Sequence, residues 1–363
     1  MRVTAFAPYP PEGPSTRFRL TQLAAPLSER GLDLRVLPFV TADLYPLLRR
    51  RGAVRKVSLL VGGLGRRARE IAAVSPDGVA LVHRELAPLL NRALLRRLRG
   101  TGAPLVFDFD DAVYLPSPGA HPLLGPLRHP EAVTRAFCRA AAAVMAGNEH
   151  LAAWAREARG GGPGVHVVPT VVDTDRFRPR PADERAPGPP RVGWVGSHTS
   201  LPYLEALDPV LEDLRAHRRF DLVVVANRAP RMRAEHTFVP WTPEGEVDQV
   251  RGLDVGLYPL PDDPWARGKC GFKAIQYMAC GVPVVASPVG VLRDLVSPGE
   301  TGFLADGPGA WKEGVARLLD DAAGRRAMGA RGRERVVRSY SLASQVDAVA
   351  GILSQARETG GRR

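Results

Sequence analysis

The chain has 363 residues, with 45% hydrophobic and 24% charged side chains and a formal net charge of +12. This length suits two domains of ordinary size, and the hydrophobic content excludes a globally disordered chain. The positive charge favours anionic partners, namely nucleotide sugars, acidic lipids or nucleic acid, but the Arg, Ala, Gly and Pro bias of a high-GC genome raises the charge in the same way.

Cysteine usage and the apolar runs indicate a compartment. The three cysteines, Cys138, Cys270 and Cys280, have no metal-ligand spacing and fit a reduced cytoplasm. The first residues are typical of a strand and show no signal-peptide pattern, and no apolar run reaches the roughly 18 residues of a membrane span. We therefore expect a cytoplasmic protein.

The first 39 residues predict a strand–helix–strand unit of a parallel sheet, with strands at 2–8 and 32–39 and a helix from about Thr16. Gly13, Arg17 and Arg19 lie near the start of that helix, beside the carboxyl end of the first strand, where open α/β sheets bind ligands. The two arginines are ligand contacts in one interpretation and surface charge in the other, and we favour surface charge.

Residues 47–69 are strongly basic and partly apolar. They contain eight Lys or Arg residues, namely Arg49, Arg50, Arg51, Arg55, Lys56, Arg66, Arg67 and Arg69. Such a segment can rest on an anionic membrane, which would place the protein peripherally at the inner face. A solvated helix pair has the same composition. Nucleic-acid binding is not expected, because aromatic residues are few here and no nucleic-acid motif is present.

Polar residues follow two further predicted strands. The strand at 79–82 leads into His83 and Arg84, which belong either to a ligand cleft or to an ordinary helix start. The strand that begins at Leu105 ends in Asp108, Asp110 and Asp111.

The Asp-x-Asp pattern of this strand has three interpretations. It matches the metal-binding motif of GT-A glycosyltransferases and the nucleophile strand of haloacid-dehalogenase-like phosphatases, and it also suits the polar edge of a cleft. A phosphatase needs this strand to lead its domain, but a complete strand–helix–strand unit precedes it. We favour the cleft edge and keep Asp110 as a catalytic candidate.

The middle of the chain predicts the end of one α/β unit and the start of another. Residues 165–177 predict a buried strand with an Asp-rich turn, in which His166 is expected to pack in the core. Residues 178–190 are rich in Pro and Arg and predict a linker. A strand at 191–195 then leads into a turn at Gly196 and Ser197 that can face a phosphate.

The most informative run is 268–287, which predicts a loop, a helix, a Gly turn and a buried strand. On a helical period, Lys269, Lys273 and Gln276 share one stripe. Two ammonium groups at a helix N-terminus favour an anion, and the chemistry suggested is diphosphate binding. A solvated polar face beside a buried one is the alternative.

This run resembles the donor-site signature of GT-B glycosyltransferases, family 4 in particular. The shared ending, Met-Ala-x-Gly-x-Pro-Val-Val, is Met278–Val285 here. The two glutamates of the signature fall on Gly268 and Gln276, so both acids are replaced. Residues 165–177 and 296–304 resemble two other phrases of the family, and the likeness covers nearly the whole chain. We therefore identify a variant member.

The resemblance implies an enzyme that transfers a sugar from a nucleotide-sugar donor to an unknown acceptor, with retention of configuration and with no metal or other cofactor. Lys269 and Lys273 would stabilise the leaving diphosphate, and Gln276 would bond the ribose hydroxyls. The implied donor-binding residues also include Gly196, Ser197, Pro240, Trp241, Gly268, Cys270, Gly271 and Phe272. Those implied on the acceptor side are Gly13, Arg17, His83 and Arg84.

The expected fold is therefore α/β, with two Rossmann-like domains facing a cleft. Residues 1–177 form the acceptor-side domain, 178–190 the linker and 191–340 the donor-side domain, and residues 341–363 form a helix that packs back on the first domain. The alternatives are a GT-B protein that binds nucleotide sugars but has lost catalysis, and a phosphatase that uses Asp108 and Asp110.

Overall fold

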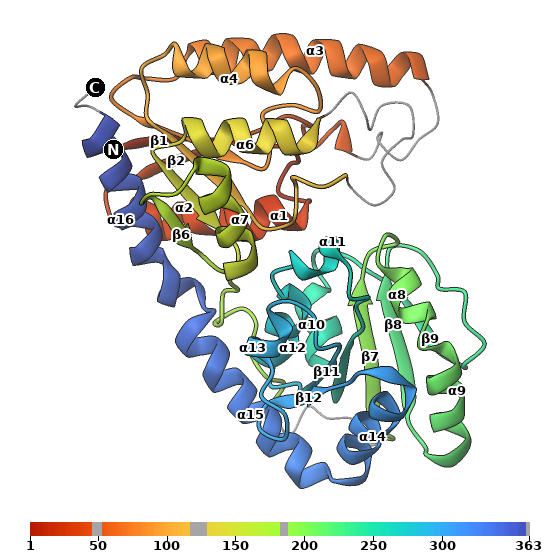
Figure 1. The fold of residues 1–363 in the computed structure, drawn as a ribbon. Coiled ribbons are helices and arrows are strands. Elements are labelled where there is room, and N and C mark those ends of the chain that lie inside the picture. Colours follow the sequence, from red (N-terminus) through yellow and green to blue (C-terminus); the bar gives the residue numbers. More distant parts are fainter. Residues whose placement is uncertain (46–52, 117–128, 182–187, 361–363) are drawn as a thin grey trace. The chain divides into compact units, whose positions relative to one another are not determined.

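The computed structural model describes residues 1–45, 53–116, 129–181 and 188–360 (Figure 1). The chain divides into two compact units, residues 1–170 with 345–363 and residues 171–344. The first unit thus ends at Thr170, before the expected boundary at 177. The middle of the expected linker, 182–187, lies outside the described residues.

The first unit contains a six-stranded sheet in the order β2-β1-β3-β4-β5-β6, and every neighbouring pair is parallel. The chain builds outward from β1 to β2, then returns past β1 to β3, so the strand order reverses between β1 and β3. The strands are β1 (Arg2–Ala7), β2 (Asp33–Pro38), β3 (Val79–His83), β4 (Leu105–Phe109), β5 (Ala143–Ala146) and β6 (Val165–Val167).

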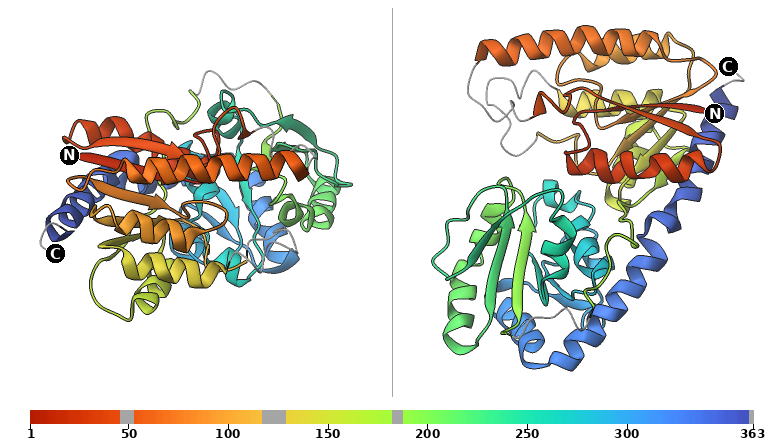
Figure 2. Two further views of the ribbon diagram at one scale, coloured as in Figure 1. Left: turned by 90° about the horizontal axis from the view of Figure 1, so that it is seen from above. Right: turned by 180° about the vertical axis from the view of Figure 1, so that it is seen from behind.

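Helices cover both faces of this sheet. One layer contains α3 (Ala53–Ala72), α4 (Asn91–Arg99) and α6 (Pro130–Ala140), with α7 (Glu149–Arg159) against α6. Figure 2 shows α1 (Pro14–Arg19) and α2 (Ala24–Ser28) on the opposite face. The last helix, α16 (Leu342–Gly360), begins in the second unit and continues into the first, where Asp347 pairs with Arg30.

The single helix expected from Thr16 is divided in the structure. α1 ends at Arg19, a 3-10 turn follows at Thr21–Leu23, and α2 begins at Ala24. Pro26 explains the division, because in one continuous helix its ring would meet the carbonyl of Gln22 and its nitrogen would donate no hydrogen bond. The break leaves Arg19 directed into the molecule, where it is 5% exposed.

The second unit repeats the architecture with a different strand order, β12-β11-β10-β7-β8-β9, again with parallel neighbours. The first strand in the chain, β7, therefore lies beside the fourth, β10, as in doubly wound nucleotide-binding sheets. The strands are β7 (Arg191–Gly196), β8 (Asp221–Ala226), β9 (Thr237–Pro240), β10 (Val255–Tyr258), β11 (Val284–Ala286) and β12 (Gly302–Leu304). The two parallel sheets confirm the predicted α/β class.

The helices of this unit also form two layers (Figure 1). One contains α8 (Leu201–Glu205), α9 (Asp208–His217) and α14 (Gly307–Asp320). The other contains α10 (Glu246–Arg251), α12 (Phe272–Ala279), α13 (Leu292–Leu295) and α15 (Ala322–Ser339), and α11 (Pro264–Arg267) precedes α12.

Tyr277 fixes α12 on the sheet. Its buried hydroxyl accepts a hydrogen bond from the backbone N–H of Val195 at 2.8 Å and lies 3.3 Å from the carbonyl of Leu257. Its ring occupies the place of a side chain on Gly256, since a Cβ there would lie 2.5 Å from the ring. The helix is thus held at the junction of β7 and β10.

The basic segment 47–69 is described only in part, since residues 46–52 lie outside the described residues. Arg67 on α3 is fully buried rather than solvated, and it donates hydrogen bonds to the carbonyls of Ala7, Leu37 and Leu86. Burial lowers its pKa to about 10 despite the neighbouring Glu70 carboxylate. Within the described ranges, no helix is long and apolar enough to cross a bilayer.

His166 differs from its prediction as a packed core residue. It lies on the short strand β6 at the edge of the sheet, where its side chain is only half-buried. Desolvation, followed by the nearby positive charge of Arg159, lowers its pKa. The apolar residues around it in the sequence indicated a strand with two covered faces, but an edge strand leaves alternate side chains accessible to solvent.

Candidate functional site

Each sheet presents predicted site residues at the carboxyl edge where its strand order reverses. In open α/β sheets, loops leave in opposite directions at such a point and a crevice for ligands forms there. In the second unit, this point lies between β7 and β10. The α12 helix lies against β10 and β11, and its Tyr277 hydroxyl reaches the backbone of β7. In the first unit it lies between β1 and β3.

Lys273 in the first turn of α12 places its ammonium at the β7–β10 junction. The Nζ atom lies 5.2 Å from the ring centroid of Trp194 on β7 and 5.2 Å from that of Tyr258 on β10. It also lies 3.4 Å from the hydroxyl of Ser200, in the loop that follows β7. Aromatic faces attract a cation, so these contacts fix the ammonium in place.

The backbone before α12 supplies a second element for an anion. Gly271 is the N-cap residue with φ +68°, and it has no side chain of its own to cap the helix. A Cβ at this position would lie 3.0 Å from Leu295. Glycine therefore gives both the left-handed backbone and the close approach, and the first-turn N–H groups point toward the carboxyl edge of the sheet.

Other predicted donor residues of this run lie in the loop just before α12 or at its first position. Gly268 and Cys270 are buried, while Lys269 and Phe272 are half-buried. The structure therefore places Lys269 two residues before the N-cap, with part of its side chain accessible.

The turn after β7 is built around Trp194. A Cβ on Gly196 would lie 2.3 Å from the indole ring, so glycine is required for this ring to lie flat beneath Lys273. Ser197 is exposed, and its hydroxyl lies 2.7 Å from that of Thr199. The structure thus brings the predicted phosphate-facing turn and Lys273 together through one aromatic ring, which the sequence did not indicate.

Gln276, one turn after Lys273, is 5% exposed and contacts a carboxylate that was not predicted. Its amide nitrogen lies 3.4 Å from Oε1 of Glu246, the first residue of α10. Glu246 is 3% exposed, and its Oε2 lies 3.7 Å from the guanidinium of Arg176.

Pro240 and Trp241 lie at the end of β9, at the same edge of the sheet but beyond β8. Pro240 is exposed, and its carbonyl accepts a hydrogen bond from the amide of Gln249 at 3.0 Å. The backbone N–H of Trp241 donates to the carbonyl of Ala226 at 3.0 Å, and the side chain is half-buried. Whether Trp241 stacks on a base stays a prediction.

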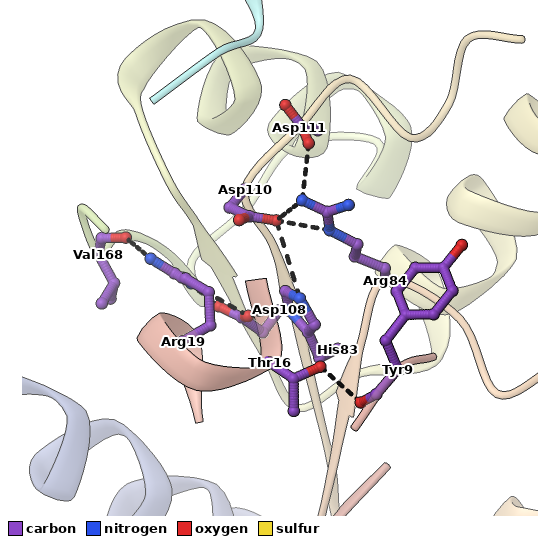
Figure 3. A network of polar contacts seen from close by, with 9 residues as sticks. All are labelled: Tyr9, Thr16, Arg19, His83, Arg84, Asp108, Asp110, Asp111 and Val168. Carbon is purple, nitrogen blue, oxygen red and sulfur yellow. Dashed lines mark hydrogen bonds and ion pairs between the residues drawn. The ribbon is translucent and has the colours of Figure 1, made fainter. Parts of the chain in front are cut away.

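In the first unit, two of the predicted acceptor-side residues, His83 and Arg84, belong to a polar network at the ends of β1, β3 and β4 (Figure 3). Asp108, which is 1% exposed, is held by a two-pronged contact from Arg19 and by Nδ1 of His83 at 2.6 Å. Arg19 also donates to the carbonyl of Val168 at 2.6 Å. The prediction of Arg19 as surface charge is therefore wrong, because Asp108 compensates for its burial.

A second ion cluster, formed by Arg84 with two aspartates, lies next to the buried Asp108 contacts. Arg84 donates from Nε to Asp110 at 2.7 Å and from Nη2 to Asp111 at 2.6 Å. The Nε2 atom of His83 is buried, has no hydrogen-bond partner among the described residues and lies 3.8 Å from Asp110. Arg84 has φ +64°, a left-handed conformation that is unfavourable for a non-glycine residue and is often maintained at functional sites.

The charges in this network determine the pKa values of its acids. Burial by itself raises the pKa of Asp110, but Arg84, His83 and Arg19 outweigh it and bring the value to about 2. For Asp108, burial is likewise outweighed by Arg19 and His83, which lower the pKa. The carboxylates raise the pKa of Arg84 against its burial. Both aspartates are thus ionised at neutral pH.

Two further predicted residues lie beside this network. Arg17 is half-buried, with its guanidinium 4.7 Å from the ring centroid of Phe18. Gly13 closes a tight turn, with its N–H on the carbonyl of Pro10 at 2.8 Å. A Cβ on Gly13 would lie 2.9 Å from the Cβ of Tyr9, so this turn excludes larger residues.

The phosphatase alternative does not suit this geometry. A nucleophilic aspartate must have one carboxylate oxygen accessible to a phosphorus atom, but both oxygens of Asp108 are engaged inside the unit by Arg19 and His83. Asp110 is engaged by Arg84. These carboxylates form a structural and polar edge rather than an exposed nucleophile.

Comparisons with known proteins agree with this geometry. Residues 189–321 match the family described as glycosyl transferases group 1. A D-inositol 3-phosphate glycosyltransferase of Salinispora tropica is 43% identical over 208 residues, covering 49% of this chain and 43% of that protein. The protein of the same name from Xylanimonas cellulosilytica is 30% identical over 222 residues, covering 53% and 51%. The chain thus spans about half the length of these curated relatives.

Solved structures match over both units. Sucrose-phosphate synthase from Thermosynechococcus elongatus superposes with a TM-score of 0.72 at 18% identity, covering 99% of this chain and all (100%) of that one. HepE of Anabaena, in complex with UDP and glucose, gives a TM-score of 0.68 at 15% identity, covering 98% and 100%. At these identities the likeness establishes the fold alone.

The predicted fold class is therefore confirmed, and the resemblance found in residues 268–287 is supported by a family match that contains that whole run. Residues 189–321 thus match the group 1 glycosyltransferase family, and the chain has the two-domain GT-B fold.

Proposed function

We propose that this protein is a glycosyltransferase that moves a sugar from a nucleotide-sugar donor to an acceptor hydroxyl. The observation that carries the proposal is the position of Lys273. Its ammonium is held between an aromatic ring of β7 and one of β10, in the first turn of α12, where the strand order reverses. A diphosphate is the anion that the helix N-terminus, Lys269 and Lys273 would bind together.

The chemical role of this arrangement is to stabilise the leaving group. When the bond between the anomeric carbon and the diphosphate oxygen breaks, negative charge develops on that oxygen. The Lys273 ammonium and the α12 N–H groups would stabilise this charge without reorganising, because aromatic rings and the helix already fix them. The acceptor hydroxyl forms the new bond to the anomeric carbon, and its proton passes to the departing diphosphate oxygen.

The finer features are proposals of the same kind. We propose that transfer retains the anomeric configuration and proceeds without a bound metal, with the lysines in the place that a divalent cation takes in other transferases. Proton NMR of the product tests the configuration. Activity that persists in excess EDTA supports the second point, and activity that is lost and then restored by Mg²⁺ or Mn²⁺ contradicts it.

The polar edge of the first unit is the proposed acceptor side. His83, Asp110 and Asp111 present acceptor atoms at the ends of β3 and β4, and Arg84 holds the two aspartates in place. Carboxylate and imidazole groups suit a ligand rich in hydroxyls. D-inositol 3-phosphate, the substrate named for the relatives, is the first acceptor to test.

The direct experiment measures nucleoside diphosphate release from UDP-glucose, UDP-N-acetylglucosamine, GDP-mannose and ADP-glucose, with and without acceptor. Acceptor-dependent release from one donor supports the proposal. A protein that has lost catalysis would show a thermal shift with a donor but no turnover. A folded protein that neither binds nor turns over any nucleotide sugar contradicts the proposal.

Peripheral membrane contact through residues 47–69 is a separate proposal. Arg67 does not contribute to it, because its guanidinium is buried against carbonyls. Val61 on α3 is 63% exposed, and Arg69 is exposed on the same helix. Sedimentation with vesicles of phosphatidylcholine, with and without phosphatidylserine, tests the proposal. Equal sedimentation with both kinds of vesicle contradicts it.

A further inference from the structure

We infer that Glu246 is a positioning residue that fixes the amide of Gln276, so that its oxygen accepts a hydrogen bond from the ribose of the bound nucleotide. This inference deepens the proposed function and depends on it. The observation is the buried contact of 3.4 Å between Nε2 of Gln276 and Oε1 of Glu246.

The chemistry of the pair determines which way the amide points. A side-chain amide has one face that donates and one that accepts, and the two orientations have nearly the same shape. An ionised carboxylate can only accept. With Glu246 beside it, the NH₂ group of Gln276 must face the carboxylate, because the opposite orientation would bring two oxygens together in a buried place.

The surroundings of Glu246 keep it in position. Arg176 lies 3.7 Å from its second oxygen and also donates to the carbonyl of Pro243 at 3.3 Å. The carboxylate is therefore held between a guanidinium on one side and the amide on the other. The amide oxygen of Gln276 is left on the side away from Glu246.

The position of this oxygen relative to Lys273 suggests its partner. Residues three apart on a helix lie on the same face, so Gln276 follows Lys273 by about one turn. Phosphate oxygens are acceptors and cannot bond to another acceptor. The hydrogen-bond donors nearest to the diphosphate in a nucleoside diphosphate are the ribose 2′ and 3′ hydroxyls. An oxygen one turn from the phosphate-binding ammonium is placed for this diol.

The arrangement also accounts for an amide at this position. A lone glutamine would present a mixture of donor and acceptor faces to the ligand, whereas the pair presents a single acceptor. Exchanging the two side chains should preserve the function, since the amide would then lie on α10 and donate to a carboxylate on α12, which would face the diol. Replacing only one of the two side chains should abolish the hydrogen bond to the diol.

The test measures, by isothermal titration, the affinities for UDP, GDP and ADP and for the 2′,3′-dideoxy form of whichever binds. The wild-type protein should prefer the ribose form by about tenfold, the value of one hydrogen bond. In Glu246→Gln the preference should fall to about twofold and KM for the donor should rise by about tenfold, while kcat stays within about twofold. Gln276→Glu should lose the preference similarly, because two buried carboxylates then face each other.

The decisive variant is the exchange Glu246→Gln/Gln276→Glu, which keeps the composition and the charge. It should restore the preference to within about threefold of the wild-type value, since the coupling of neighbouring residues appears in such a cycle. Asp248→Asn, an exposed acid on the same helix, is the matched control and should leave the preference unchanged.

Two results would overturn the inference. A folded Glu246→Gln protein with the full ribose preference would show that the carboxylate only stabilises the fold. An exchange variant that folds but keeps neither affinity nor preference would show that the pair does not act as a unit. Failure of all three nucleoside diphosphates to bind the wild-type protein would contradict the proposed function itself, and this result is distinct from the other two.

Discussion

Replacing Lys273 by methionine removes one charge while keeping the length of the side chain. The ammonium lies 3.4 Å from Ser200 and 5.2 Å from each of two ring centroids. Methionine can fill the same space against the rings, so the expected loss of folding stability is that of two partly exposed cation–π contacts, about 1 kcal/mol. The fold should remain intact in this variant.

The catalytic effect should be larger than the effect on stability. Two unit charges 4 Å apart interact by about 4 kcal/mol at an effective dielectric constant of 20. Only the charge that develops in the transition state counts toward the barrier, and the Lys273 side chain is half-buried. We therefore expect a barrier increase of about 2–4 kcal/mol, close to the effect of removing one oxyanion donor, which corresponds to a fall of about 30-fold to 1,000-fold in kcat.

The assay is steady-state transfer with the donor identified by the screen, together with thermal unfolding of each variant. Lys312→Met is the matched control, because Lys312 is 44% exposed, pairs with Asp213 on the outer helices and should leave kcat unchanged. A folded Lys273→Met protein with the wild-type kcat would refute the assignment of this ammonium to the leaving group.

Three further predictions follow from the structure. The carboxylate of Asp110, whose pKa is lowered from 3.8 to about 2, stabilises the fold above about pH 4, and this stabilisation is lost as the pH falls toward 2. Asp110→Asn should therefore remove about 1 kcal/mol of the fall in stability that urea unfolding measures between pH 5 and pH 3. Gly196→Ala should lower the free energy of unfolding by about 1–3 kcal/mol and should also lower kcat, because the new Cβ displaces Trp194. Thermal unfolding measures the first effect and the transfer assay measures the second. Arg67→Met should cost about 3–5 kcal/mol, since the carbonyls that Arg67 binds lose their donor, and the midpoint of denaturant unfolding measures it.

Much of the fold was predictable because local signals agreed with it. The apolar runs before His83 and Asp108 predicted parallel strands, and the structure places both residues at strand ends. The helical period of residues 268–287 predicted that Lys273 and Gln276 share a face, and α12 has this geometry. These signals depend on a few neighbouring residues and on the side-chain period alone.

What the sequence did not indicate depends on partners that are distant in the chain. Arg19 is buried because Asp108, 89 positions away, compensates for its charge. Arg67 is buried because carbonyls of three other segments accept its hydrogen bonds. Glu246 and Gln276 are 30 positions apart and meet only when α10 packs on α12. A charged residue in a helical pattern indicates an exposed face unless the sequence reveals its partner.

The central claim, that the N-terminus of α12 and Lys273 bind a diphosphate, is tested most directly by comparing nucleoside diphosphates with monophosphates. Titration calorimetry of UDP, GDP and ADP and of their monophosphates should show at least about a tenfold preference for one diphosphate in the wild-type protein. In Lys273→Met that preference should largely vanish, while affinity for the monophosphate changes little. An equal preference in both proteins would contradict the account.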